Sequence, residues 1–90
     1  MSSRRSKLEI TLNILSIVRS GVDKPTRIMY AANMSWAPVQ RILSHLVEQG
    51  LLEDQLNEES RQSKRLYVIT EKGVGVLDYF DKAKQLINII

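Results

Sequence analysis

The stretch KPTRIMYAANMSWAPVQRILSHLVEQGLL, residues 24–52, has two segments with helical spacing of apolar residues on either side of Asn33-Met34-Ser35. Asn33 tolerates the left-handed conformation that closes a helix, and Ser35 is of a residue type that caps the start of the next one. Gly50 and two leucines follow the second segment, which is typical of a helix that stops and gives way to a strand. The stretch therefore predicts two helices joined by a tight turn, with a strand beginning just after them.

Each of the two helices has a start signal and a packing face. Asp23 is expected to cap the first helix, and Pro25 lies in its first turn, where a missing N–H costs little. The packing face of this helix is formed by Ile28, Met29, Ala31 and Ala32. Pro38 lies in the first turn of the second helix. Its apolar residues follow the spacing i, i+3, i+4, i+7: Val39, Ile42, Leu43 and Leu46.

The flanking segments complete the order of elements. Apolar spacing and turn residues predict a helix over about residues 4–19, strands over 51–57 and 64–69, and a polar hairpin loop over 58–63 between them. Thr70 is expected to cap a last helix. The order helix, helix, turn, helix, hairpin, helix is that of a winged helix-turn-helix with a C-terminal helix. This is an α+β fold that is mostly helical.

Positive charge is concentrated in the N-terminal part of the chain. Residues 1–41 carry seven Lys or Arg and two acidic residues, a net charge of +5, and residues 42–90 carry six and eight, a net charge of −2; the sum is the formal +3. A one-sided basic excess is typical of a chain with a polyanionic partner, although a solvated basic surface gives the same counts. The absence of cysteine suits a reducing interior. The sequence has no run of about 18 apolar residues, so no membrane span is predicted.

The sequence carries no signature of catalysis or of metal binding. It has one histidine, no cysteine and no Gly-rich phosphate loop, and no nucleophile has a base at a recognisable spacing. His45 is interpreted as a surface residue of a helix. We therefore expect a binding protein rather than an enzyme, with no cofactor, no metal and no small-molecule ligand.

Three sequence elements occur in an order that resembles a known class of proteins. TRIMYAANMSW (residues 26–36), EQGLL (48–52) and ITEKG (69–73) are similar to segments of small archaeal winged-helix transcription regulators and chromatin-type DNA-binding proteins. The resemblance implies double-stranded DNA as a partner, a homodimer that pairs through the C-terminal helix, and a cytoplasmic, nucleoid-associated location. It leaves open whether the role is regulatory or architectural.

Candidate DNA contacts follow from this fold, in which the second helix of the pair reads base edges mainly through its N-terminal residues. Gln40 suits adenine, Arg41 suits guanine, and Ser44 suits either base. Trp36 either packs against the turn or contacts DNA. With phosphate contacts from the first helix, the turn and the hairpin, the predicted DNA-binding set is Arg27, Ser35, Trp36, Ala37, Gln40, Arg41, Ser44, His45, Arg61, Lys64 and Arg65. Glu58 and Glu59 at the hairpin tip oppose a DNA contact there.

The last helix has the apolar spacing of a pairing helix. Its apolar residues, Val76, Phe80, Ala83, Ile87 and Ile90, are spaced by 4, 3, 4 and 3 residues, a heptad rhythm over about two repeats. The chain ends in LINII, most of which a lone helix end would expose. We therefore predict a DNA-binding domain over residues 1–70, with a basic arm over 1–7, and a dimerisation helix over 71–90. The alternative is that this helix packs back on its own domain.

Two further interpretations compete with DNA binding. A winged-helix module that binds protein would have an acidic or apolar outer face on the second helix of the helix-turn-helix pair. Glu48, Glu58 and Glu59 favour such a module, whereas Arg41 and its polar neighbours oppose it. An RNA-binding protein is disfavoured, because the sequence offers no aromatic stacking platform on a sheet.

Overall fold

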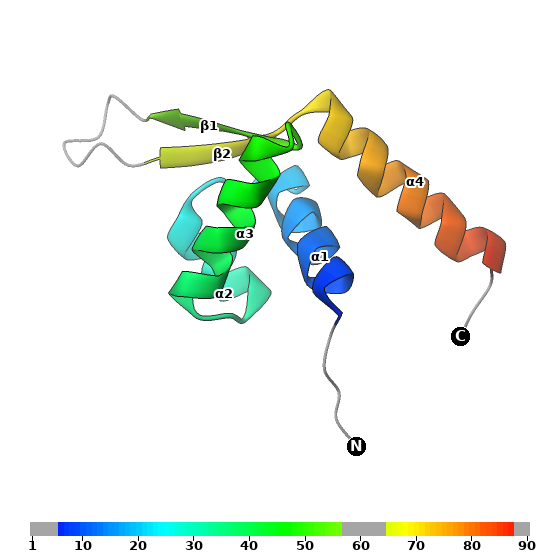
Figure 1. Ribbon diagram of the computed structural model, residues 1–90, viewed down its shortest axis with the longest axis horizontal. Helices are drawn as coiled ribbons and strands as arrows, with labels where there is room; N and C mark the ends of the chain where they lie inside the picture. The colour runs from blue at the N-terminus through cyan, green and yellow to red at the C-terminus, as the bar shows by residue number, and fades with distance from the viewer. Residues whose placement is uncertain (1–5, 57–64, 88–90) are drawn as a thin grey trace, which may run out of the picture.

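The predicted order of elements is confirmed by the structure, a computed structural model that describes residues 6–56 and 65–87. Figure 1 shows the elements in chain order: α1 (Lys7–Arg19), α2 (Pro25–Ala32), α3 (Trp36–Glu48), β1 (Leu52–Leu56), β2 (Arg65–Ile69) and α4 (Glu71–Ile87). The fold is α+β and mostly helical, as predicted. None of the helices in the described ranges is both long enough and apolar enough to cross a membrane.

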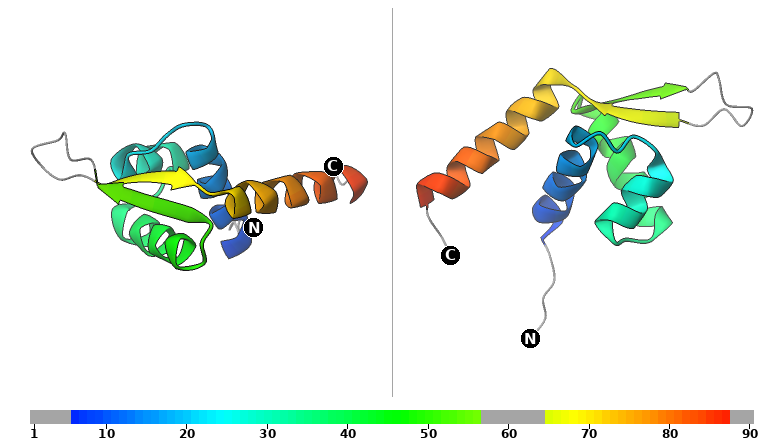
Figure 2. Two further views of the ribbon diagram at one scale, coloured as in Figure 1. Left: turned by 90° about the horizontal axis from the view of Figure 1, so that it is seen from above. Right: turned by 180° about the vertical axis from the view of Figure 1, so that it is seen from behind.

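The elements form a compact body from which α4 projects. Helices α1, α2 and α3 pack together beneath an antiparallel hairpin in which Leu52 pairs with Ile69 and Leu56 with Arg65. Figure 2 shows α4 leaving the body beyond the hairpin, with its first turns beside α1 and its remaining turns diverging from it. The body and the projecting helix are therefore held together mainly at the start of α4.

One hydrophobic core joins all six elements. The buried side chains are Ile14, Leu15, Val18, Ile28, Ala32, Val39, Leu43, Leu46, Leu52, Tyr67 and Leu77. The apolar spacing of α3 is confirmed, since Val39, Leu43 and Leu46 are buried and Ile42 packs against them. Helix α3 is thereby fixed against the core along one side, and its opposite side is left in solvent.

The turn between α2 and α3 has the predicted geometry, but the start of α2 does not. Asn33 adopts the left-handed conformation (φ 56°), and Ser35 occupies the cap position of α3 without a capping bond from its side chain. The prediction that Asp23 caps α2 is wrong, because the cap position falls on Lys24, which makes no side-chain capping bond. Asp23 contributes its backbone carbonyl instead, which accepts a hydrogen bond of 2.9 Å from the N–H of Tyr67 in β2.

The end of α3 and the start of α4 are bonded to each other. Thr70 caps α4 as predicted, since its hydroxyl accepts a hydrogen bond from the N–H of Gly73 at 3.1 Å. The same hydroxyl donates to the carbonyl of Gly50 at 2.7 Å, and the backbone N–H of Thr70 donates to the carbonyl of Leu51 at 3.2 Å. Lys72 donates to the carbonyl of Gln49 at 2.8 Å. Two of the motifs quoted above, EQGLL and ITEKG, are therefore in direct contact.

Gly73 is required at this junction because no side chain fits there. A Cβ atom at this position would lie 2.3 Å from the carbonyl oxygen of Leu51, far inside van der Waals contact, whereas a Cβ at Gly75 would meet nothing within 4 Å. Both glycines lie in the first turns of α4. Glycine is a poor helix former. The sequence makes the two positions look alike, but only Gly73 has a packing reason to be glycine.

The matched pair Gly73→Ala and Gly75→Ala tests this junction. We expect Gly73→Ala to lower the free energy of unfolding by roughly 1–3 kcal/mol, because the backbone must shift to relieve the overlap. Gly75→Ala should raise it by up to about 1 kcal/mol through helix propensity. Urea denaturation of both variants measures the difference. Equal effects of the same sign would show that the contact with Leu51 does not constrain the fold.

Tyr67 anchors the hairpin to the body and supplies a second test. Burial of its side chain raises the pKa of Tyr67 above the ordinary 10.0, the Asp54 carboxylate raises it further, and the Arg65 guanidinium opposes both effects. In the unfolded chain this phenol loses its proton near its ordinary pKa, while the folded protein still holds it. The contribution of this group to stability is therefore constant at neutral pH and is lost as the pH rises from the ordinary value through the folded value.

Tyr67→Phe should remove this alkaline dependence. The gap in the free energy of unfolding between the original protein and the variant should shift in favour of the variant between about pH 8 and about pH 11, because only the original protein carries a buried phenol that must lose its proton. Tyr79→Phe, which removes a phenol hydroxyl at an exposed position on α4, is the matched control. A gap for Tyr67→Phe that stays constant between the two pH values would contradict a buried, neutral phenol.

Candidate nucleic-acid interface

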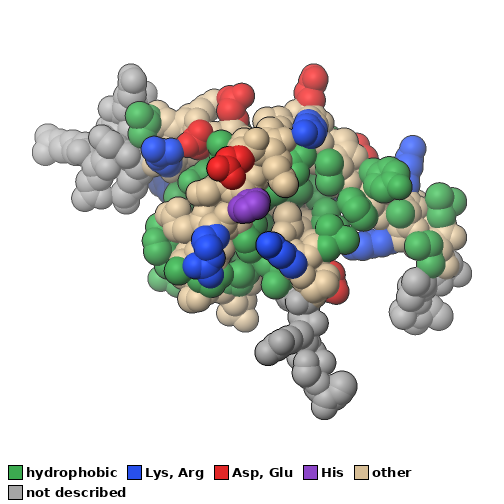
Figure 3. Space-filling model, viewed as in Figure 1, with side chains coloured by type: hydrophobic (Ala, Val, Ile, Leu, Met, Phe, Trp, Pro, Cys, Tyr) green, Lys and Arg blue, Asp and Glu red, His purple; other side chains and the backbone are tan. Residues whose placement is uncertain are grey.

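The outer side of α3 carries most of the predicted contact residues. Because Val39, Leu43 and Leu46 face the core, the residues about 180° away on the helix face solvent. Ala37, Arg41, Ser44 and His45 are exposed there, and Gln40 is half-buried at one side. In Figure 3 the histidine lies beside Lys and Arg side chains on this face, and acidic side chains gather nearer the hairpin. The N-terminal part of α3 is therefore the more favourable end for an anionic partner.

The polar residues of α3 divide between two grooves. We call the groove between α2, α3 and β2 the wing-side groove; it is lined by Lys24, Pro25, Thr26, Arg27, Tyr30, Trp36, Gln40, Ser44, Arg65 and Tyr67. Arg41 and His45 lie on the other side of the helix. There they line a groove against α1 together with Lys7 and an apolar floor that includes Ile10, Met34 and Ile42. The structure thus places base-reading candidates along a ridge, with cations on both sides of it.

Phosphate contacts predicted from the hairpin have mixed support. Arg65 forms an ion pair with Asp54 on the neighbouring strand, which offsets part of its charge. Arg61 and Lys64, like Glu58 and Glu59, lie outside the described residues, so their role stays a prediction. Arg27, by contrast, is exposed on α2 and lines the wing-side groove, and Ser35 is exposed at the start of α3.

Two residues of these grooves, Lys24 and Tyr30, escaped the sequence analysis. Tyr30 is 73% exposed and lines the wing-side groove with Lys24. Lys7, which the sequence analysis assigned to the basic arm, begins α1 and lines the other groove. Tyr30 could have been found from the helical spacing, because it falls off the packing face that Ile28 and Ala32 define. Nothing in the one-dimensional sequence places Lys7 near α3.

Trp36 was predicted either to pack against the turn or to contact DNA. Its side chain is 45% exposed, and the exposed part faces the wing-side groove. A DNA contact by Trp36 therefore stays a prediction.

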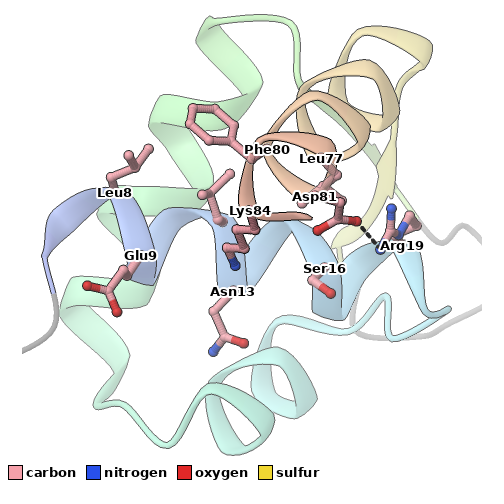
Figure 4. A pocket seen from close by; sticks show the side chains of 10 residues that line it. Leu8, Glu9, Asn13, Ser16, Arg19, Leu77, Phe80, Asp81 and Lys84 are labelled. Atoms are coloured by element: carbon pink, nitrogen blue, oxygen red, sulfur yellow. Dashed lines mark ion pairs between the residues drawn. The ribbon is translucent and has the colours of Figure 1, made fainter. Parts of the chain in front are cut away.

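A third hollow lies between α1 and α4. Figure 4 shows Leu8, Leu77 and Phe80 along one side of it and Glu9, Asn13 and Ser16 along the other. Arg19 of α1 reaches Asp78 at 3.6 Å and Asp81 at 3.8 Å on α4, so this hollow is crossed by ion pairs. Its lining mixes acids with bases, which suits an anionic ligand less well than the wing-side groove does.

The predicted pairing residues of α4 are only partly covered by their own domain. Val76, Phe80 and Ala83 are half-buried, whereas Ile87 is 61% exposed. Ile90 lies outside the described residues. Phe80 packs edge-to-face against Tyr79, with ring centroids 5.3 Å apart. An apolar stripe therefore continues along α4 beyond the reach of α1.

Within residues 6–56 and 65–87, no three His, Cys, Asp or Glu side chains gather closely enough to hold a metal ion. The chemistry that the two grooves beside α3 offer is hydrogen bonding, positive charge and exposed aromatic surface.

The architecture is similar to that of several solved structures. Sso10a-2, a DNA-binding protein from Sulfolobus solfataricus, superposes with a TM-score of 0.74 at 25% identity, over 93% of this chain and 83% of that one. A MepR–DNA complex from Staphylococcus aureus gives a TM-score of 0.77 over 88% of this chain and 65% of that one. At 12% identity, the likeness to MepR shows the fold alone.

Sequence comparison identifies relatives and the family. The chain is 31% identical over 86 residues to the uncharacterised protein MJ0290 of Methanocaldococcus jannaschii, and 31% identical over 70 residues to MJ0287 of the same organism. It spans 37% and 64% of the lengths of these two relatives. A model of the winged helix-turn-helix family matches residues 4–88. Since this match covers nearly the whole sequence, the chain belongs to the winged helix-turn-helix family.

Proposed function

We propose that the protein binds double-stranded DNA as a homodimer, with the N-terminal part of α3 in the major groove. The observation that carries this proposal is the placement of Arg41, Ser44 and His45 on the solvent side of α3, with Gln40 half-buried beside them and cations in the grooves on both sides. A major groove of about 12 Å admits one α-helix, and the strands that border it present phosphates to both sides of that helix. The likeness to Sso10a-2, a DNA-binding protein, supports the same conclusion.

Different residues would recognise the bases and contact the phosphates of the DNA backbone. Arg41 can donate two hydrogen bonds to a guanine edge, and Gln40 can form the corresponding pair with adenine. Lys7, Lys24 and Arg27 would neutralise phosphates, which position the duplex without reading its sequence. The ion pair between Arg65 and Asp54 makes the hairpin the weaker contributor. Most of the affinity should therefore come from α3 and its two grooves.

The biological role is either transcription regulation or DNA architecture. A regulator needs a large ratio of specific to non-specific affinity, whereas an architectural protein does not. Binding to random duplex and to a selected site, at matched salt, measures this ratio.

A module that binds only protein is the alternative, favoured by Glu48 on the outer side of α3. Absence of binding to random duplex even at low salt would favour it.

Arg41→Ala tests the base-reading role. We expect a loss of about 1–3 kcal/mol on the preferred site and a relaxed preference at one base position, because the bidentate pair with guanine is removed. Binding of a duplex library, followed by titration of single sites, measures both effects. Lys82→Ala removes one positive charge from an exposed position on α4 and is the matched control. An equal loss on all sequences would assign Arg41 to a phosphate and refute the base contact.

Dimerisation through α4 is proposed from its uncovered apolar residues. Leu86 is 85% exposed and Ile87 is 61% exposed in the lone chain. Burial of an Ile or Phe side chain contributes roughly 1.5–3 kcal/mol. Two copies of Phe80 and Ile87 would thus supply enough apolar contact to hold a pair. Two-fold pairing would also present two α3 helices to successive major grooves, about 34 Å apart.

The double variant Phe80→Asp, Ile87→Asp tests this seam. We expect a monomer in sedimentation, with much weaker DNA binding, because two carboxylates would be buried in each half of the interface. Gln85→Asp adds a charge to the same helix at an exposed polar position and should remain a dimer. Circular dichroism separates dissociation from unfolding. A double variant that stays dimeric with full DNA affinity would rule out α4 as the interface.

A further inference from the structure

The wing-side groove combines two features that duplex recognition does not require together. Two large aromatic side chains are exposed in it, Tyr30 to 73% and Trp36 to 45%. Lys24 and Arg27 lie in the same lining. Among the described residues that line this groove there is no Asp or Glu, in contrast to the mixed lining between α1 and α4. The groove is therefore both cationic and aromatic.

This combination suits a nucleobase that is not stacked in a duplex. In double-stranded DNA the faces of the bases are covered by their neighbours, and only their edges are presented to the grooves. Aromatic side chains bind exposed base faces, and cations beside them follow the phosphates; this is how proteins hold single strands with little sequence preference. Gln40 and Ser44, in the same groove, could hydrogen-bond to the edge of the base.

We propose that the wing-side groove binds an unpaired stretch of nucleic acid, with bases stacked on Tyr30 and Trp36 and their phosphates against Lys24 and Arg27. The shared chemistry is an unpaired base with flanking phosphates, which single-stranded DNA and single-stranded RNA both supply. Trp36, Gln40 and Ser44 also belong to the duplex surface proposed above. A single strand and a duplex should therefore compete, although the single-strand proposal does not depend on duplex binding.

The simplest competing explanation assigns both aromatics to phosphates. The hydroxyl of Tyr30 and the indole N–H of Trp36 can each donate a hydrogen bond to a phosphate oxygen. In that case the ring of Tyr30 is only a spacer, and removal of the hydroxyl alone abolishes the contact. Stacking makes the opposite prediction, since phenylalanine stacks as tyrosine does.

Trp36 provides the readout, because it is the one tryptophan of the chain. The probes are oligothymidylate and oligouridylate of about 12 nucleotides, within the size range of known single-strand sites. A blunt duplex serves as the third probe. Stacking should quench the fluorescence of Trp36 on addition of at least one single strand. Comparison of the quenching by oligothymidylate with the quenching by oligouridylate identifies whether the ligand is DNA or RNA.

Three variants separate stacking from other causes. We expect Tyr30→Ala to weaken single-strand binding by about 5- to 150-fold, the loss that corresponds to one stacked base. Tyr30→Phe should bind as the original protein does. Tyr79→Ala removes an exposed tyrosine from α4, outside the groove, and is the matched control. Since Tyr30 and Tyr79 are both exposed, neither replacement should impair folding.

The outcomes distinguish this inference from the proposed function. Absence of quenching by both single strands overturns the inference, and duplex binding that persists in the same samples leaves the proposed function intact. Single-strand quenching without duplex binding supports the inference and overturns the proposed duplex binding. Equal losses for Tyr30→Phe and Tyr30→Ala would assign the hydroxyl to a phosphate and refute stacking. Equal quenching by the blunt duplex and the single strands, unchanged in Tyr30→Ala, would also overturn the inference, because contact with the duplex surface alone would then explain the response of Trp36.

Discussion

The carbonyl group of Leu51 lies where the end of α3, the start of β1 and the start of α4 meet. It follows the end of α3, immediately precedes β1, and accepts a hydrogen bond from the N–H of Thr70 at 3.2 Å. The backbone of Gly73 lies so close to it that no Cβ atom fits between them. With the Thr70 hydroxyl on Gly50 and Lys72 on Gln49, the junction sets the direction in which α4 leaves the body. The spacing of two α3 helices in a pair joined through α4 would be set by this same junction.

The fold could be predicted wherever the signal is local. The spacing of Val39, Leu43 and Leu46 determines which side of α3 is buried, and Asn33 adopts the left-handed conformation that its residue type tolerates. The capping of α2 could not be predicted in this way. The backbone carbonyl of Asp23 accepts a hydrogen bond from Tyr67, a residue of β2 that is distant in the sequence, and the cap position falls on the next residue. The same limit applies to Gly73, whose close neighbour Leu51 is distant in the sequence.

The base-reading part of the candidate site was predicted as one face of one helix, and in the structure this face is a ridge between two grooves. Helical spacing identifies Gln40, Arg41 and Ser44 as outward-facing, because that property depends only on the helix. Which side each residue faces depends on the elements alongside, since α1 contributes Lys7 and α2 contributes Lys24 and Tyr30. The charge of Arg65 is likewise partly offset by Asp54 on the neighbouring strand. Charge counts along the sequence record that the N-terminal part is basic, but not that its cations surround α3.

Helix α4 is secured at one end only, so the folding of its far half would be coupled to pairing. Leu77 is its deepest side chain, and the ion pairs of Arg19 with Asp78 and Asp81 are exposed, so they contribute little to stability. Beyond Phe80 the helix has few partners within its own chain. A helical segment of that length is marginal in water on its own, and most helical stability in proteins comes from packing of an apolar face. Pairing would therefore stabilise the far half of α4 as well as bury it. The order of this half should then increase with protein concentration, whereas the junction at Leu51 and the start of α4 should not depend on it.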